Sequence, residues 1–103
     1  EFQLELHQCV LSFPKIDKHT LGQTTVAKSL QLIETIFVAS RLSADGGGKR
    51  DLLLQANGQL DLLKLLIRMS RDTKALNQKK YMLLESFLQE SGKMLGGWLK
   101  SLN

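Results

Sequence analysis

Basic side chains at helical spacing are the residues of this sequence whose types and order point most directly to chemistry. They form two rows, Lys64, Arg68 and Arg71 in one segment and Lys79, Lys93 and Lys100 in the next. Within each row the spacing returns to one helical face. Cations in such rows neutralise phosphates, and two rows on adjacent antiparallel helices predict a surface that follows a nucleic-acid backbone. An alternative for the two rows is that they are only the solvated faces of a bundle. Tyr81, beside Lys79 and Lys80, could stack on a base, and the alternative for this residue is that its ring is packed in the protein.

Nucleophilic, acid–base and metal chemistry have little support in the sequence. The two histidines, His7 and His19, lie in different segments, and the spacings His-x-x-x-His, Glu-x-x-His and Cys-x-x-Cys are absent. Cys9 is the single cysteine and falls on an apolar helical stripe, where a core role is usual. Neither a nucleophile elbow nor a Gly-x-Gly-x-x-Gly pattern occurs. We therefore expect no catalytic residue, no metal, no cofactor and no enzymatic activity.

A set of glycines stands beside the tryptophan near the end of the chain. Gly92, Gly96 and Gly97 fall in one apolar segment, and each glycine inside a helix costs roughly 1 kcal/mol relative to alanine. The apolar period continues through Trp98, so the helix is not expected to stop at the glycines. We expect Gly92, Gly96, Gly97 and Trp98 to pack closely against a neighbouring helix, within the chain or in an oligomer.

Apolar segments of helical period must position these residues, and the first two precede the basic rows. A first helix is predicted from residue 1 to about residue 12, and Pro14 ends it. Its apolar face is the line Phe2, Leu6, Cys9 and Val10, and Phe13 continues the same spacing. The helix is already under way at residue 1, so its start is expected further upstream. A second helix is predicted from Thr20 to residue 40 or 41, because Thr20 and Gln23 fit a capping box. Its predicted core face is the line Val26, Leu30, Ile33 and Phe37.

Two longer segments carry the basic rows. After a glycine-rich loop at 43–48, expected to be flexible, a third helix is predicted over residues 49–74, with the core line Leu53, Ala56, Leu60, Leu63 and Ile67. A fourth begins at Asn77, a good N-cap, and runs to about 101 with the line Leu84, Leu88, Ser91, Leu95, Trp98 and Leu102. Further apolar residues beside the third line, Leu62, Leu66 and Met69, predict burial on two sides. Oligomerisation would supply it, although a thick monomer core remains an alternative.

The whole chain predicts one domain over residues 1–103, an all-α antiparallel up-and-down four-helix bundle. No run of 18 apolar residues exists, so no membrane span is expected, and a lone cysteine does not favour secretion. The expected location is cytoplasmic. The net charge is +4, and residues 64–100 hold eight Lys and Arg against three Asp and Glu. Such a field favours polyanions or acidic surfaces as partners.

Several stretches together resemble one known family. They are FPK at residues 13–15, LGQ at 21–23, DLLKLLIRMSRDTK at 61–74 and GKMLGGWLK at 92–100. These stretches are similar to the accessory variability determinant (Avd) proteins of diversity-generating retroelements, and the likeness covers nearly the whole chain. LGGWLK is its most specific part. The four-helix proteins encoded in ribosomal-RNA intervening sequences share the fold but lack the Leu-Gly-Gly-Trp ending.

The resemblance implies a four-helix bundle that assembles into a ring-like homopentamer with a basic, tapered channel. It also implies binding to the retroelement's RNA and to its reverse transcriptase, in a bacterial, archaeal or phage-encoded system. By position, Lys64 and Arg68 match basic positions on the family's third helix, and Lys93 and Lys100 match those on its fourth. The glycine-rich stretch 43–48 departs from the family pattern, so no function is carried over to it. A net charge of +4 is lower than is usual in the family.

Two functions of different classes follow from the sequence. The first is a nucleic-acid-binding accessory protein that partners a reverse transcriptase and binds structured RNA or DNA. The second is an oligomeric four-helix scaffold whose basic face docks an acidic protein. Retention of RNA or DNA at low salt separates the two.

Overall fold

The computed structural model describes residues 2–43 and 47–102, and this part of the chain is helical with no strand. The elements are α1 (Phe2–Leu11), the short α2 (Lys15–Asp17), the π-helical turn η1 (Lys18–Gly22), α3 (Gln23–Ser40), α4 (Gly47–Asp72) and α5 (Gln78–Ser101). The prediction of an all-α fold is confirmed. Among the described residues, no helix is both long and apolar enough to cross a membrane.

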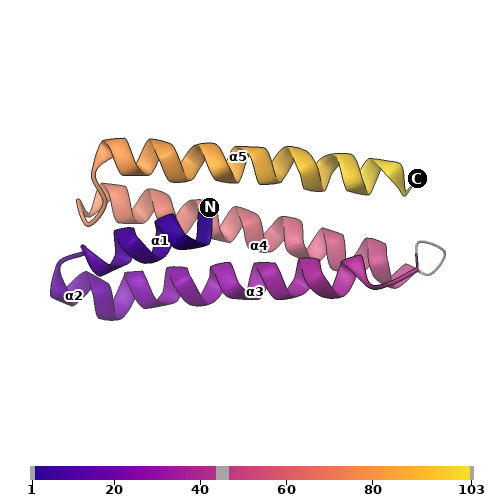
Figure 1. Ribbon diagram of the computed structural model, residues 1–103, viewed down its shortest axis with the longest axis horizontal. Helices are drawn as coiled ribbons and strands as arrows, with labels where there is room; N and C mark the ends of the chain where they lie inside the picture. Colours follow the sequence, from indigo (N-terminus) through magenta and orange to yellow (C-terminus); the bar gives the residue numbers. More distant parts are fainter. Residues whose placement is uncertain (1, 44–46, 103) are drawn as a thin grey trace.

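Three long helices lie side by side, and successive ones run in opposite directions (Figure 1). The middle one, α4, packs against both α3 and α5, and the short α1 packs against the same two helices. Helix α1 and helix α4 therefore occupy opposite corners of the cross-section. The molecule measures 47 × 21 × 19 Å, and α1, with 10 residues or about 15 Å at the usual rise, extends along only part of its length (Figure 1).

The core forms where the apolar stripes of α1, α4 and α5 meet. Every residue of the predicted α4 line is buried, and so are Leu6, Cys9, Val10 and Phe13 of the first segment. Helix α5 contributes Leu84, Leu88 and Leu95, while Trp98 and Leu102 pack at the edge. The apolar periodicity of these three segments thus predicted their buried faces correctly.

The predicted core face of α3 is wrong except at Val26, which is half-buried and packs against the core. Leu30, Ile33 and Phe37 are exposed, and the buried residues are Thr25, Ser29, Leu32, Thr35 and Ala39. Small side chains on this stripe let α3 lie close to its neighbours. Each buried hydroxyl of this stripe has a carbonyl acceptor three or four residues earlier in the chain, as Thr25 Oγ1 has Leu21 O of η1 at 2.7 Å and Thr35 Oγ1 has Gln31 O at 3.0 Å. The hydroxyl of Ser29 also lies 3.2 Å from Gln3 Oε1 of α1. Burying them therefore carries little of the usual desolvation penalty.

The start of this helical region also differs from the prediction. Thr20 lies inside η1, and its hydroxyl donates to Ile16 O at 2.9 Å, so the capping box of Thr20 and Gln23 does not form. The helical path begins earlier, after Pro14. Gly22 is buried at the point where α1 packs on this path, and a Cβ there would stand 2.8 Å from Val10 Cγ1. The close approach of the two segments therefore requires a residue without a side chain.

The ends of α4 and α5 lie close to the positions that the sequence predicted. Gly47 and Gly48 belong to the first turn of α4, so the predicted loop is shorter than 43–48, and its residues 44–46 lie outside the described part. Lys74 takes a left-handed conformation, with φ 67°, just after α4. Asn77 caps α5 as predicted, and its side chain accepts from Lys80 N at 2.8 Å.

Candidate nucleic-acid interface

The basic row of α4 lies along its contact with α5. Lys64 and Arg71 are half-buried there, and Arg68 is exposed. The Nζ atom of Lys64 stands 3.6 Å from the position that a Cβ of Gly92 would take. The guanidinium carbon of Arg71 lies 4.3 Å from the ring centroid of Tyr81. Two members of the row therefore reach across to α5, and the predicted row exists as one surface feature.

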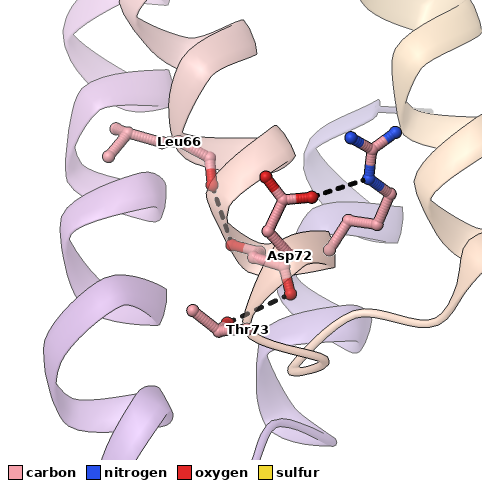
Figure 2. A network of polar contacts seen from close by, with 5 residues as sticks. Leu66, Asp72 and Thr73 are labelled. Carbon is pink, nitrogen blue, oxygen red and sulfur yellow. Dashed lines mark hydrogen bonds and ion pairs between the residues drawn. The ribbon is translucent and has the colours of Figure 1, made fainter.

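Arg71 is held in place more firmly than its neighbours in the row. Its Nε donates to Asp72 Oδ1 at 3.1 Å (Figure 2). In the same turns at the end of α4, Thr73 Oγ1 donates to Ser70 O and Ser70 Oγ donates to Leu66 O. Tyr81, under the guanidinium, is partly buried against the core. Tyr81 is therefore a packed tyrosine, and part of the charge of Arg71 is already balanced by Asp72.

The lysines of α5 form a more open set. Lys79, Lys93 and Lys100 are exposed, and within residues 2–43 and 47–102 they make no hydrogen bond or ion pair through their side chains. They span 21 residues, or about 30 Å of helix at the usual rise. Lys93 adjoins Gly92, which faces Lys64 of α4. Lys79 and Lys100 lie towards opposite ends of the helix.

One carboxylate interrupts the positive surface. Glu85 is half-buried and lies between Tyr81 and Gly92 on the side of α5 that faces α4. Its Oε1 accepts from Gln89 Nε2 at 3.0 Å, and its Oε2 is buried without a hydrogen-bond partner among the described residues. The surface therefore consists of separated cations with a carboxylate between them. This carboxylate would repel a single anion bound at the centre, whereas the separated cations can each contact a different phosphate of a nucleic-acid backbone.

The glycine set divides into two kinds of position. Gly92 faces Leu60 and Lys64 of α4 at ordinary contact distance. Gly96 and Gly97 have open space where a side chain would stand, so packing within the chain does not account for them. Trp98 is half-buried, and Lys49 Nζ lies 5.1 Å from its ring centroid. The sequence analysis missed this contact of Lys49, because it joins two helices far apart in the sequence.

Comparison with protein families supplies the identification. The profile of the family described as bAvd-like matches residues 1–102. The chain belongs to the bAvd-like family. Neither a comparison with curated proteins nor one with solved structures gave a match. The resemblance found in the LGGWLK and FPK stretches is thereby confirmed at the level of the family.

Other reactive side chains of this bAvd-like chain lie apart from one another. His7 is on α1 and His19 on η1, where its Nδ1 is 3.5 Å from Gln23 Nε2. In the described part of the chain, no three His, Cys, Asp or Glu side chains gather as a metal site would require. Cys9 is buried, and burial raises the pKa of its thiol, aided by Glu5 and opposed by Lys80. A buried thiol of raised pKa is a poor nucleophile.

Proposed function

We propose that this bAvd-like chain is a nucleic-acid-binding accessory protein that works with a retroelement reverse transcriptase in diversity-generating mutagenic retrohoming. The observation that carries the proposal is the row of exposed cations along α4 and α5. Arg68, Lys79, Lys93 and Lys100 have no acidic partner within the described residues. Their charges remain available for phosphates, whereas those of Arg71 and Lys80 are partly engaged by Asp72 and Glu5.

Binding of this kind works by replacing the counterions of the nucleic acid. Each cation that settles beside a phosphate releases a condensed ion, which makes affinity fall steeply with salt. Separated cations over about 30 Å of helix suit an extended or folded backbone rather than one base. Phosphate contacts set register and carry little sequence information, so the preference for a particular RNA would come from shape.

Membership of the family supports the finer parts of the proposal. The chain would act as an antiparallel up-and-down four-helix bundle within a homopentamer, and its reverse transcriptase would carry out the chemistry. It would have no catalytic residue of its own and would work in the cytoplasm. Gly96, Gly97 and Trp98 would lie at contacts between subunits, since within residues 2–43 and 47–102 nothing lies within 4 Å of where a Cβ of either glycine would stand.

A charge-reversal pair tests the site. Lys64→Glu with Arg68→Glu should weaken retention of structured RNA on filters by at least about tenfold, because two phosphate contacts are replaced by repulsion. The matched control is Lys28→Glu on α3 with Arg41→Glu directly after it, which makes the same change in net charge outside α4 and α5. The control should weaken binding only slightly.

The outcomes separate the hypotheses. Unchanged affinity in the Lys64 and Arg68 variant would contradict the site, and equal losses in both variants would show that only net charge matters. No retention of RNA or DNA by the unmodified protein at low salt would favour the scaffold that binds an acidic protein. Melting followed by circular dichroism shows that each variant is folded.

A further inference from the structure

A cleft of about 510 Å³ lies at the end of the bundle where α1 stops and the chain passes from α4 to α5 (Figure 1). Its walls come from Gln8 and Cys9 of α1, from Ser12 just after it, and from residues 74–77 and 80. Small-molecule sites usually have volumes of roughly 300–1,000 Å³, so the cleft is large enough for a ligand. The function proposed above does not use it.

The polar side chains around this cleft are rich in hydrogen-bond donors. Lys74 and Lys80 bring two ammonium groups, and no Asp or Glu of the described residues lines the cleft. Asn77 accepts from Lys80 N through Oδ1 at 2.8 Å, so its amide nitrogen is left to donate. Glu5 lies outside the lining, with Oε1 3.5 Å from Lys80 Nζ, and balances only that lysine. The cleft therefore carries an excess of positive charge and suits an anion.

Lys74 is the residue of the cleft whose backbone is strained. Its φ of 67° lies in the left-handed region, which glycine adopts without the penalty that a Cβ brings. Within residues 2–43 and 47–102, its side chain makes no hydrogen bond or ion pair that would offset this cost. Strained positions of this kind gather at ligand sites. Binding of an anion would account for a lysine at a position where glycine would give a more stable fold.

The deeper part of the cleft is apolar. Cys9 and Leu76 are buried, and Ala75 between the lysines is half-buried. Two cations over an apolar floor fit a ligand that has a doubly charged group and a less polar body. A phosphate monoester carries a charge of about −1.5 to −2 at pH 7, which matches Lys74 and Lys80 together. A carboxylate would balance only one of them.

We propose that this cleft binds a phosphate monoester of a nucleotide, with Lys74, Lys80 and the amide of Asn77 contacting the phosphate oxygens. The phosphate belongs either to the end of an RNA or DNA strand or to a free nucleotide, since the same groups recognise both. Lys79, a member of the α5 row, directly precedes Lys80, so a strand bound along that row can place its end in the cleft. The strand-end form rests on the proposed function, whereas the free-nucleotide form does not.

The test measures the contribution of a terminal phosphate to binding. RNAs of one sequence with an internal fluorophore carry a phosphate at the 5′ end, at the 3′ end or at neither end, and fluorescence anisotropy gives their affinities. A phosphate at one of the ends should tighten binding about tenfold, because it gains charge-assisted hydrogen bonds. Adenosine 5′-monophosphate should compete away this gain, and adenosine should not. A fluorescent derivative of adenosine 5′-monophosphate is titrated separately.

Three variants assign the effect to the cleft. Phosphate-dependent binding, of the RNA end or of the nucleotide, should be largely lost in Lys74→Gly, although relief of the strained backbone lets this variant fold at least as well as the unmodified protein. The matched control Lys79→Gln removes the same charge outside the lining of the cleft and should keep this binding. Glu5→Gln frees Lys80 from its ion pair and should strengthen phosphate-dependent binding about two- to fivefold.

The outcomes separate this cleft from the proposed function. Equal affinity for all three RNAs together with no binding of the nucleotide would overturn the cleft and leave the proposed function intact. Retention of phosphate-dependent binding in Lys74→Gly, or its loss in Lys79→Gln, would also overturn it. Binding of the nucleotide with no preference among the RNAs would identify a free nucleotide as the ligand. Binding of the nucleotide without any binding of RNA or DNA would support the cleft and contradict the proposed function.

Discussion

Two leucines of α3 test which face of this helix is core. Leu32 is 6% exposed and Leu30 is 51% exposed, although both stand on the same helix two residues apart. Truncation to alanine changes helix propensity equally at both positions, so the difference between the variants reports burial. Leu32→Ala removes a side chain that packs in the core, and such changes cost about 2–4 kcal/mol. Leu30→Ala should cost less than about 1 kcal/mol, since half of its side chain already meets water.

The assay is urea unfolding of both variants, followed by circular dichroism at a low protein concentration. For a small protein, a loss of about 3 kcal/mol lowers the urea concentration at the unfolding midpoint by roughly 1–3 M, which is well resolved. The expected order is the unmodified protein, then Leu30→Ala, then Leu32→Ala. If Leu30→Ala destabilises as much as Leu32→Ala, then the large apolar stripe of α3 is buried in the monomer, and the orientation of α3 described above is wrong.

Three further predictions concern single residues. Gly22→Ala should destabilise the fold by about 1–3 kcal/mol in urea titrations, since the added Cβ meets Val10 Cγ1, and an unaltered midpoint would count against the close approach. Lys74→Gly should stabilise by about 0.5–1 kcal/mol because it relieves the left-handed backbone, whereas Lys74→Ala should bring no gain. The pKa of Cys9 is raised from its ordinary 9.0 by burial, so the thiol favours folding below pH 9, and this contribution is lost as pH rises above 9. Stability should fall less over that range in Cys9→Ala, and equal slopes would contradict the burial of the thiol.

The sequence predicted the buried faces of α1, α4 and α5 because the most regular apolar line of each segment is the one that is buried. Helix α3 carries two stripes, one of large apolar residues and one of small and hydroxylated residues. Hydrophobicity favours the first, but the structure buries the second, in which Ser29 donates to Val26 O at 2.7 Å. Intrahelical hydrogen bonds of this kind are invisible to a hydrophobic pattern. Packing against α1 and α4 decides the face, and periodicity within a single segment holds no information about it.

The sequence predicted which basic residues make up the candidate site, but not the contacts that these residues make with other side chains. Helical spacing placed Lys64, Arg68 and Arg71 on one surface correctly. The contacts that hold or neutralise the cations join side chains from different helices. Arg71 lies over the ring of Tyr81, and Lys80 forms an ion pair with Glu5 at 3.5 Å. The interruption by Glu85 follows from the register between α4 and α5, which the sequence does not specify.

The salt dependence of RNA binding tests the central claim most directly. The four exposed cations of the two rows, Arg68, Lys79, Lys93 and Lys100, should each release about one counterion. A plot of the logarithm of the association constant against the logarithm of salt concentration should then have a slope of about −3 or steeper. Reversal of Lys64 and Arg68 should flatten that slope. Binding that does not change with salt, or no binding to RNA or DNA at low salt, would contradict the assignment of this bAvd-like chain as a nucleic-acid-binding accessory protein.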